Sequence, residues 1–285
     1  MVGSSRGAVG TRNLLDRYGP WAVVTGASDG IGRAAAGALA ADGFHVVLVA
    51  RRAARLAEIA RDLEASHRIE TRVVAADLSL EAEVERIDSE TRDLDIGLLF
   101  AAAGFGASGP FVEAPASGEL EMIDVNCRAL VQSAHGFAKR FVARGRGGLV
   151  LMSSLVAFQG VPRAATYAAT KAFVQTFAEG LARELRPLGI DVLASAPGPV
   201  KSGFGARARM AITSGQTPET VARGTLAALG RRTTVRPGLL AKALEASLAL
   251  LPRPFRVRAM ERVMAGLTRE RAPTLGARGA QGAKG

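Results

Sequence analysis

"VVTGASDGIG", residues 23–32, is the stretch that decides the fold of this chain. Its apolar start predicts the end of a β-strand, its glycines a tight turn, and its last residues the start of a helix. In such a unit the first glycine permits the turn, the second lets backbone approach a pyrophosphate, and the third lets the helix pack on the strand. Gly26, Gly30 and Gly32 hold these positions. The stretch predicts a dinucleotide-binding turn, with a purely structural turn as the alternative.

Similar apolar runs recur along the chain at regular intervals. They cover residues 21–26, 44–50, 71–77, 96–104, 147–154 and 190–198. The segments between them have helical patterns, at 31–41, 52–66, 79–92, 118–144 and 166–187. Each apolar run lacks a polar face, which is typical of parallel strands covered on both sides. We therefore expect an α/β fold, a Rossmann-like doubly wound parallel sheet of about seven strands with helices on both faces and a C-terminal helical extension.

The pattern changes beyond Pro197. We expect a single domain over 13–238, which includes a lid loop at 199–216 and a last edge strand within 231–238. Two amphipathic helices at 239–271 should pack on or beside this domain. The termini, residues 1–12 and 272–285, have the composition of disordered tails.

Composition predicts a soluble cytoplasmic protein. The single cysteine excludes an intrachain disulfide framework, no apolar run reaches the length of a membrane span, and the first residues lack the apolar core of a secretory signal. The net charge is +11, but the residues after Leu251 supply more than half of it, and no aromatic residues interleave with these arginines. We therefore expect no nucleic-acid partner. The basic segment 253–271 is either a membrane-surface anchor or, as we favour, a solvated or subunit-contact helix.

The end of the second predicted strand indicates which dinucleotide binds. A carboxylate there would accept the ribose hydroxyls of NAD, whereas this strand ends in "LVARR", with Arg51 and Arg52. Arginine pairs well with phosphate oxygens, so the sequence favours NADP over NAD. The alternative is that both arginines are solvated charges at a helix start, and Asp29 in the glycine turn counts mildly against added phosphate affinity.

"YAATK", residues 167–171, places a tyrosine and a lysine four positions apart. On a helix these two side chains share one face. A lysine charge beside a phenol favours the phenolate and lowers the phenol pKa, which suits acid–base chemistry. Alone, the pair also fits a surface helix.

Taken together these motifs resemble the short-chain dehydrogenase/reductase family, from about residue 19 to residue 204. The matching elements, in order, are TGASDGIG, Asp77-Leu78, AAAG at 101–104, Asn126, Ser154 thirteen residues before Tyr167, YAATK, and Pro197-Gly198. Within the family the chain is similar to 3-oxoacyl-thioester reductases, 17β-hydroxysteroid dehydrogenases and bacterial DltE-like members.

The resemblance implies a catalytic set. Tyr167 would be the general acid, Lys171 would hold the nicotinamide ribose and lower the tyrosine pKa, and Ser154, rather than Ser153, would hydrogen-bond the substrate oxygen. Asn126 would hold a water that relays protons to Lys171. Donors aimed at the oxygen on which charge develops stabilise the transition state.

The resemblance also implies a cofactor site for NADP(H), with NAD(H) less favoured. Its expected residues are Gly26, Ser28, Asp29, Gly30, Ile31, Gly32, Arg51, Arg52, Asp77, Leu78, Ala102, Gly104, Tyr167, Lys171, Pro197, Gly198, Val200 and Ser202. One departure is that Ala101 and Ala102 replace two asparagines of the family, so we expect a weaker tie between neighbouring strands there.

The expected function is NADPH-dependent reduction of an apolar ketone, such as a 3-oxoacyl thioester, steroid or terpenoid, or the reverse oxidation. The expected substrate pocket is apolar and contains Phe105, Phe111, Phe158, Val161, Phe204 and Met210. The alternative is an NADP(H)-binding sensor or scaffold with little turnover. The helices 118–144 and 166–187 resemble those through which the family forms dimers and tetramers, so the resemblance implies a homo-oligomer. The scattered His45, His67 and His135 predict no metal site, and Cys127 is expected to be a core residue.

Overall fold

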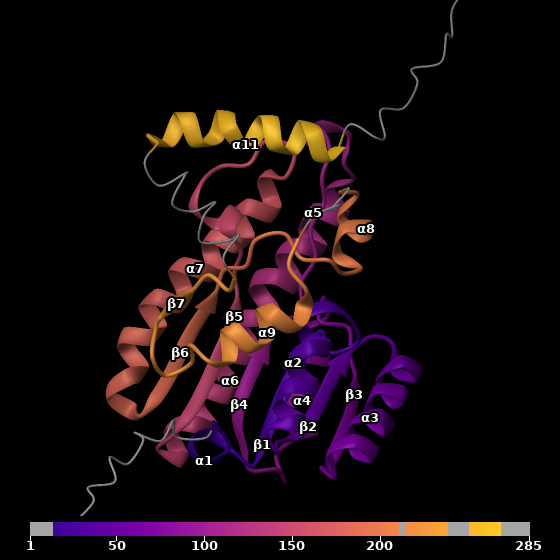
Figure 1. The fold of residues 1–285 in the computed structure, drawn as a ribbon, viewed down its shortest axis with the longest axis vertical. Coiled ribbons are helices and arrows are strands. Elements are labelled where there is room, and N and C mark those ends of the chain that lie inside the picture. The colour runs from indigo at the N-terminus through magenta and orange to yellow at the C-terminus, as the bar shows by residue number, and fades with distance from the viewer. Residues whose placement is uncertain (1–13, 211–214, 239–250, 269–285) are drawn as a thin grey trace, which may run out of the picture.

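The computed structural model describes residues 14–210, 215–238 and 251–268. Within these residues seven parallel strands form one sheet in the order β3-β2-β1-β4-β5-β6-β7 (Figure 1). The strands are β1 (Trp21–Thr25), β2 (His45–Ala50), β3 (Thr71–Ala75), β4 (Ile96–Ala101), β5 (Gly147–Met152), β6 (Ile190–Ser195) and β7 (Thr234–Val235). The doubly wound parallel sheet is confirmed. The strand order reverses between β1 and β4, where ligands bind in folds of this kind.

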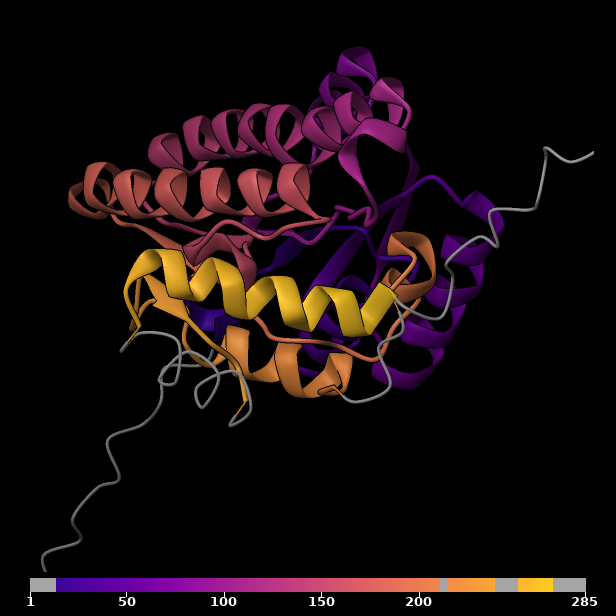
Figure 2. The same ribbon diagram turned by 90° about the horizontal axis from the view of Figure 1, so that it is seen from above.

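Helices cover both faces of the sheet, as Figures 1 and 2 show. One core cluster packs α2 (Gly30–Ala41), α3 (Ala53–His67) and α9 (Pro218–Leu226) on one face. The second cluster packs α4 (Glu81–Ser89), α6 (Ala129–Arg144) and α7 (Ala165–Leu185) on the other. Alternate residues of β1 enter opposite clusters, Val24 the first and Val23 the second. This alternation explains why the strands are apolar on both faces.

Eight further elements complete the description of these residues. They are α1 (Leu14–Tyr18), η1 (Phe111–Glu113), α5 (Ala116–Ile123), η2 (Asp124–Arg128), η3 (Leu155–Phe158), η4 (Arg186–Leu188), α8 (Phe204–Ala208) and α11 (Arg253–Thr268).

Two segments differ from the sequence-based expectation. The helix expected at 118–144 is interrupted by η2, a π-helical turn between α5 and α6. Such turns occur often at functional sites because they redirect side chains. The loop expected at 199–216 contains the helix α8, and residues 211–214 lie outside the described residues.

α11 lies over the carboxyl ends of the strands. α11 crosses above the sheet in Figure 1, and Figure 2 shows it running past α7 and α9. The other helix expected within 239–271 falls at 239–250, outside the described residues, as do the expected tails 1–12 and 272–285. None of the described helices has the length and apolar character that a membrane crossing would need.

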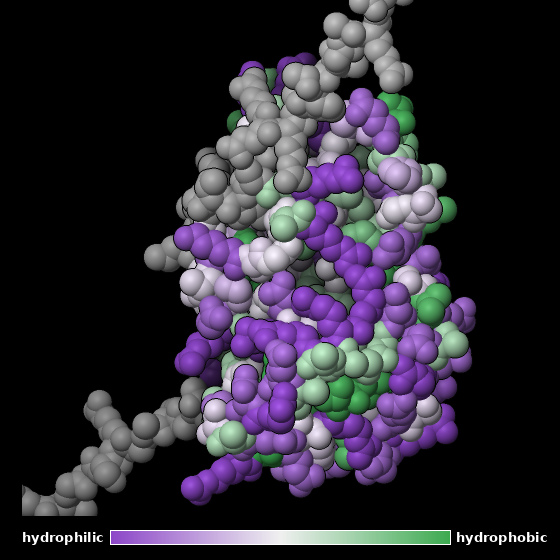
Figure 3. Space-filling model, turned by 90° about the vertical axis from the view of Figure 1, so that its right-hand side faces the viewer, coloured by the Kyte–Doolittle hydropathy of each residue, from purple (hydrophilic) through white to green (hydrophobic). Residues whose placement is uncertain are grey.

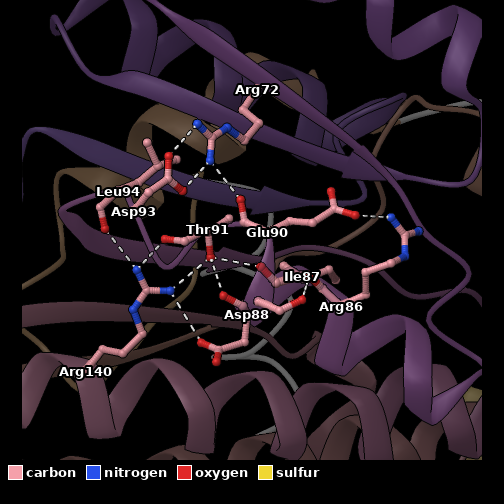
Figure 4. Close-up of polar contacts among 10 residues, drawn as sticks. Arg72, Arg86, Ile87, Asp88, Glu90, Thr91, Asp93, Leu94 and Arg140 are labelled. Atoms are coloured by element: carbon pink, nitrogen blue, oxygen red, sulfur yellow. Dashed lines mark hydrogen bonds and ion pairs between the residues drawn. The ribbon is translucent and has the colours of Figure 1, made fainter.

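Arginines fix the connection from α4 to β4 (Figure 4). Arg72, in β3, donates hydrogen bonds of 2.6 and 2.8 Å to Asp93. Arg140, in α6, donates to the backbone oxygens of Thr91 and Leu94, at 2.7 and 2.9 Å. The buried Thr91 hydroxyl in turn donates to Ile87 O at 2.8 Å. The connection is therefore held by β3 through Arg72 and by α6 through Arg140. It leads into β4, and the far end of β4 borders the site described next.

Candidate active site

A cavity of about 1030 Å³ lies at the carboxyl ends of the strands. The glycine turn, the ends of β2 to β6, α7, α8 and α11 contribute to its lining. Figure 3 shows the side of the molecule with α3, α5 and α8, where hydrophilic side chains surround a hollow near the centre of the view. A cavity of this size can hold a dinucleotide together with a second molecule.

The glycine turn has the backbone geometry of a phosphate cradle. Gly26 and Gly30 have φ of +68° and +52°, which favour glycine. A methyl group on Gly32 would lie 2.3 Å from Gly26 O, so glycine alone lets α2 start this close to the turn. Asp29 caps α2, because its Oδ1 accepts a hydrogen bond from Gly30 N at 2.7 Å. The turn therefore fits the pyrophosphate of a dinucleotide at the start of α2.

The two arginines after β2 both line the cavity but are held differently. Arg52 donates to the backbone oxygen and the hydroxyl of Ser28, at 3.2 and 3.0 Å. Arg51 lies 3.7 Å from Asp77 Oδ2 and 3.8 Å from Glu121 Oε1, longer than hydrogen bonds. Partial burial raises the pKa of Asp77, but the Ser79 contacts and Arg51 together hold it below its usual value. Arg51 is therefore a cation at the cavity wall with only loose contacts.

Tyr167 and Lys171, from α7, meet Ser154, which follows β5, at the cavity wall. The Ser154 side chain lies close enough to the Tyr167 phenol to lower its pKa. Lys171 Nζ donates to Met152 O at 2.8 Å and lies 5.8 Å from the centroid of the Tyr167 ring. Ser153 is buried and its hydroxyl donates to Lys171 O at 3.1 Å. Ser154, not Ser153, is therefore the serine paired with the tyrosine.

Burial has the largest effect on the pKa values of Tyr167 and Lys171. It raises the pKa of Tyr167 to about 12, although the Ser154 contact acts in the opposite direction. Burial also lowers the pKa of Lys171 to about 8. The tyrosine pKa is thus raised overall, because loss of water outweighs the Ser154 contact, while the lowering of this pKa by Lys171 stays a prediction. At neutral pH Tyr167 carries its proton and can donate it.

The π-helical turn brings Asn126 beside Lys171. The Asn126 side chain donates to Phe105 O at 2.9 Å and to Thr170 Oγ1 at 3.0 Å, and accepts from Phe105 N at 3.0 Å. A methyl group on Gly104 would lie 2.9 Å from Asn126 Oδ1 and 3.4 Å from Lys171 Nζ. Asn126 therefore ties the β4–α5 connection to α7, while the water relay through it stays a prediction.

The structure brings the expected cofactor residues together along the cavity. The lining includes Gly26, Ser28, Asp29, Gly30, Ile31, Gly32, Arg51, Arg52, Asp77, Leu78, Ala102, Gly104, Tyr167, Lys171, Pro197, Gly198, Val200 and Ser202. Next to Ala101 and Ala102, the Thr25 hydroxyl of β1 accepts a hydrogen bond from Ala103 N at 3.1 Å, while the weaker tie expected there stays a prediction.

The expected substrate residues divide into two groups. Phe105, Val161, Phe204 and Met210 line the cavity. Phe111 and Phe158 are absent from the lining. Phe111 is 65% exposed in η1, and the Phe158 ring packs under the Arg236 guanidinium, 4.5 Å away. Both depart from the expectation because the connections that carry them turn their rings away from the cavity.

α11 contributes cavity residues that the sequence-based expectation missed. Met260, Val263 and Met264 line the cavity, and Met264 is buried against Val161 and Ala168. The amphipathic pattern of 253–268 was a signal that this helix packs on something, but the pattern does not identify the surface that it covers. Arg207 of α8 was missed as well, and no local motif marks it.

Other reactive side chains lie apart from this cluster. Burial raises the pKa of the Cys127 thiol, in η2, which disfavours the thiolate. His45 Nδ1 accepts from Glu70 N at 2.8 Å, at the start of β2. Among the residues that the structure describes, no group of three or more His, Cys, Asp or Glu could hold a metal ion.

The comparisons of this chain with known proteins agree on one family. Residues 20–212 match the short chain dehydrogenase family. A 7β-hydroxysteroid dehydrogenase from Clostridium sardiniense is 32% identical over 80% of this chain and 89% of its own. A very-long-chain 3-oxoacyl-CoA reductase from Pyricularia oryzae is 36% identical over 62% of this chain and 56% of its own.

A solved structure agrees with these sequence matches. The short-chain dehydrogenase from Sphingobium yanoikuyae in complex with NADPH superposes with a TM-score of 0.73, at 30% identity, over 82% of this chain and 97% of that one. This chain therefore belongs to the short-chain dehydrogenase/reductase family and is an oxidoreductase that acts on CH–OH or C=O groups through a nicotinamide cofactor.

Proposed function

We propose that this protein uses NADP(H) to reduce an apolar ketone to a secondary alcohol, or to catalyse the reverse oxidation. The observation that carries the proposal is the Ser154–Tyr167–Lys171 cluster in the same cavity as the glycine turn. The bound cofactor would supply a hydride to the carbonyl carbon. Tyr167 would give its proton to the carbonyl oxygen, Ser154 would orient that oxygen by a hydrogen bond, and Lys171 would hold the nicotinamide ribose.

The loosely held Arg51 supports the preference for NADP(H). Its contacts with Asp77 and Glu121 are long enough to exchange for hydrogen bonds to a 2′-phosphate. The relative from Sphingobium yanoikuyae binds NADPH. Arg52, held by Ser28 in the glycine turn, lies beside it as a second cation.

Arg51→Asp should weaken NADPH binding far more than NADH binding. The change removes a charge-assisted hydrogen bond worth about 1.5–3 kcal/mol and adds a repulsive charge. Dissociation constants for both cofactors, measured by the change in nicotinamide fluorescence, test this. Equal losses for NADPH and NADH would show that Arg51 does not read the 2′-phosphate.

The walls of the remaining cavity support an apolar substrate. Met210, two residues after α8, and Met260 and Met264, in α11, meet Val161 near Tyr167. Methionine walls adapt to bulky apolar shapes. Steroid and 3-oxoacyl relatives make ketosteroids and 3-oxoacyl thioesters the first compounds to try.

The proposal is tested with a panel of ketosteroids, 3-oxoacyl thioesters and aryl ketones. Turnover of each compound is measured as the loss of NADPH or NADH absorbance. NADPH-preferring turnover of one compound class would support it. Tight NADPH binding without turnover of any compound would favour the sensor or scaffold alternative.

Ketone reduction should slow as the pH rises through about 8. Lys171, with its pKa lowered to about 8 by burial, loses the charge that holds the ribose hydroxyls, while Tyr167 keeps its proton to about 12. The measurement is kcat/KM for reduction between pH 6 and pH 10, which reports groups of the free enzyme. A plateau that extends to pH 10 would contradict this assignment.

Homo-oligomer formation stays part of the proposal. α5 and α7 expose Ile123 and Phe173 on one side of a hollow that Cys127 and Val131 also line. The membrane-surface and subunit-contact interpretations of 253–271 both concern the outer face of α11, since its inner face packs on the cavity.

A further inference from the structure

Two arginines from distant parts of the chain lie close to the same carboxylate oxygen. Arg51, after β2, places Nη1 3.8 Å from Oε1 of Glu121. Arg207, in α8 beyond β6, places Nη2 3.2 Å from the same oxygen. Both arginines line the cavity, whereas Glu121, in α5, is not part of its lining. A single anionic oxygen thus holds two cations that would otherwise repel each other.

One ring contact positions the Arg207 guanidinium, and one hydrogen bond holds the end of its helix. Its guanidinium lies 3.9 Å from the centroid of the Phe105 ring, within the range of a cation–π contact. The Ser108 hydroxyl donates to Ala208 O at 2.7 Å, which ties the end of α8 to the β4–α5 connection. Burial and the nearby Arg51 lower the pKa of Arg207, so an anion between the two guanidiniums stabilises both charges.

We propose that Arg207 is a second residue that reads the 2′-phosphate of NADP(H), and that this phosphate takes the place of Glu121 Oε1 between Arg51 and Arg207. The inference rests on the proposed use of NADP(H). A phosphate monoester carries about two negative charges and three acceptor oxygens, so it can accept hydrogen bonds from both guanidiniums at once. Glu121 supplies one carboxylate and holds the pair when no phosphate is present.

This arrangement makes Glu121 a competitor of the ligand phosphate. NADH lacks the 2′-phosphate and leaves the Glu121 contacts in place, so Arg207 contributes to the difference between the two cofactors. Because Arg207 lies in α8, bound NADP(H) would also hold α8 in place more firmly than bound NAD(H).

Three variants of the full chain test the inference with NADPH and NADH as probes. Arg207→Gln should weaken NADPH binding by at least about 10-fold relative to NADH, the size of one charge-assisted hydrogen bond. Glu121→Gln should strengthen NADPH binding relative to NADH, because the competing charge is gone. Arg209→Gln is the matched control: it removes the same charge two residues away, from an exposed side chain outside the cavity lining, and should change neither dissociation constant.

The outcomes separate this inference from the proposed function. An equal loss of both cofactors in Arg207→Gln would assign Arg207 to a shared part of the dinucleotide and overturn the inference, as would no loss. If Arg51→Asp abolishes an NADPH preference that Arg207→Gln leaves intact, only this inference fails. If the unmodified protein binds NADPH and NADH equally, the proposed cofactor preference itself fails. Thermal unfolding of each variant shows whether α8 and the fold are retained.

Discussion

Tyr167→Phe is expected to lower kcat for ketone reduction by about 10²–10⁴-fold, the usual contribution of a positioned general acid. The substitution removes the phenol, which keeps its proton at neutral pH and is the proposed proton donor. The ring itself stays, so its contact with Phe204, with centroids 5.4 Å apart, is preserved. NADPH affinity should change little, because the cofactor contacts of the glycine turn are untouched.

Single-turnover reduction with excess enzyme measures the chemical step directly. Ser154→Ala provides a graded comparison, because the acid remains and only its orienting partner is lost. A Tyr167→Phe protein that reduces ketones within a few-fold of the unmodified rate would assign the proton donor to another group. NADPH binding measured on the same samples excludes loss of the cofactor site as the cause.

Gly32→Ala is expected to lower kcat/KM by about 10²-fold through displacement of the glycine turn. The added methyl group would lie 2.3 Å from Gly26 O and 3.0 Å from Thr25 O, so α2 has to move away from β1. Misplacement of bound reactants by about 1 Å can cost this much. Cofactor titration and steady-state rates measure the effect, which should appear in NADPH affinity as well as in turnover.

Gly37→Ala, in the same helix, is the matched control. A methyl group there meets nothing within 4 Å, and alanine favours the helix over glycine by about 0.5–1 kcal/mol. This variant should keep full activity and unfold at a slightly higher temperature. If Gly32→Ala is as active as Gly37→Ala, close approach of α2 to the turn is not required for the cofactor site.

Much of the site follows from local sequence because its parts lie close together along the chain. Gly26, Gly30 and Gly32 occupy one turn, and Tyr167 and Lys171 lie one helical turn apart. Alternation of apolar runs with helical segments repeats often enough to define the parallel sheet. In such a sheet the strand ends gather at one edge, so residues after several strands reach one cavity.

The remaining features depend on contacts between distant segments. The amphipathic pattern of 253–268 does not reveal that Met260 and Met264 wall the cavity, and the aromatic character of Phe111 and Phe158 does not reveal that both lie outside its lining. The sequence by itself determined the strand–helix order and the glycine turn, and its resemblance to the family predicts Ser154, Tyr167 and Lys171 as one set. Only the tertiary structure decided the direction of the Tyr167 pKa shift and the meeting of Arg51 with Arg207 at Glu121. Burial and charge pairing sum over neighbours that the fold brings together, whereas hydrophobic periodicity and motif spacing are properties of consecutive residues.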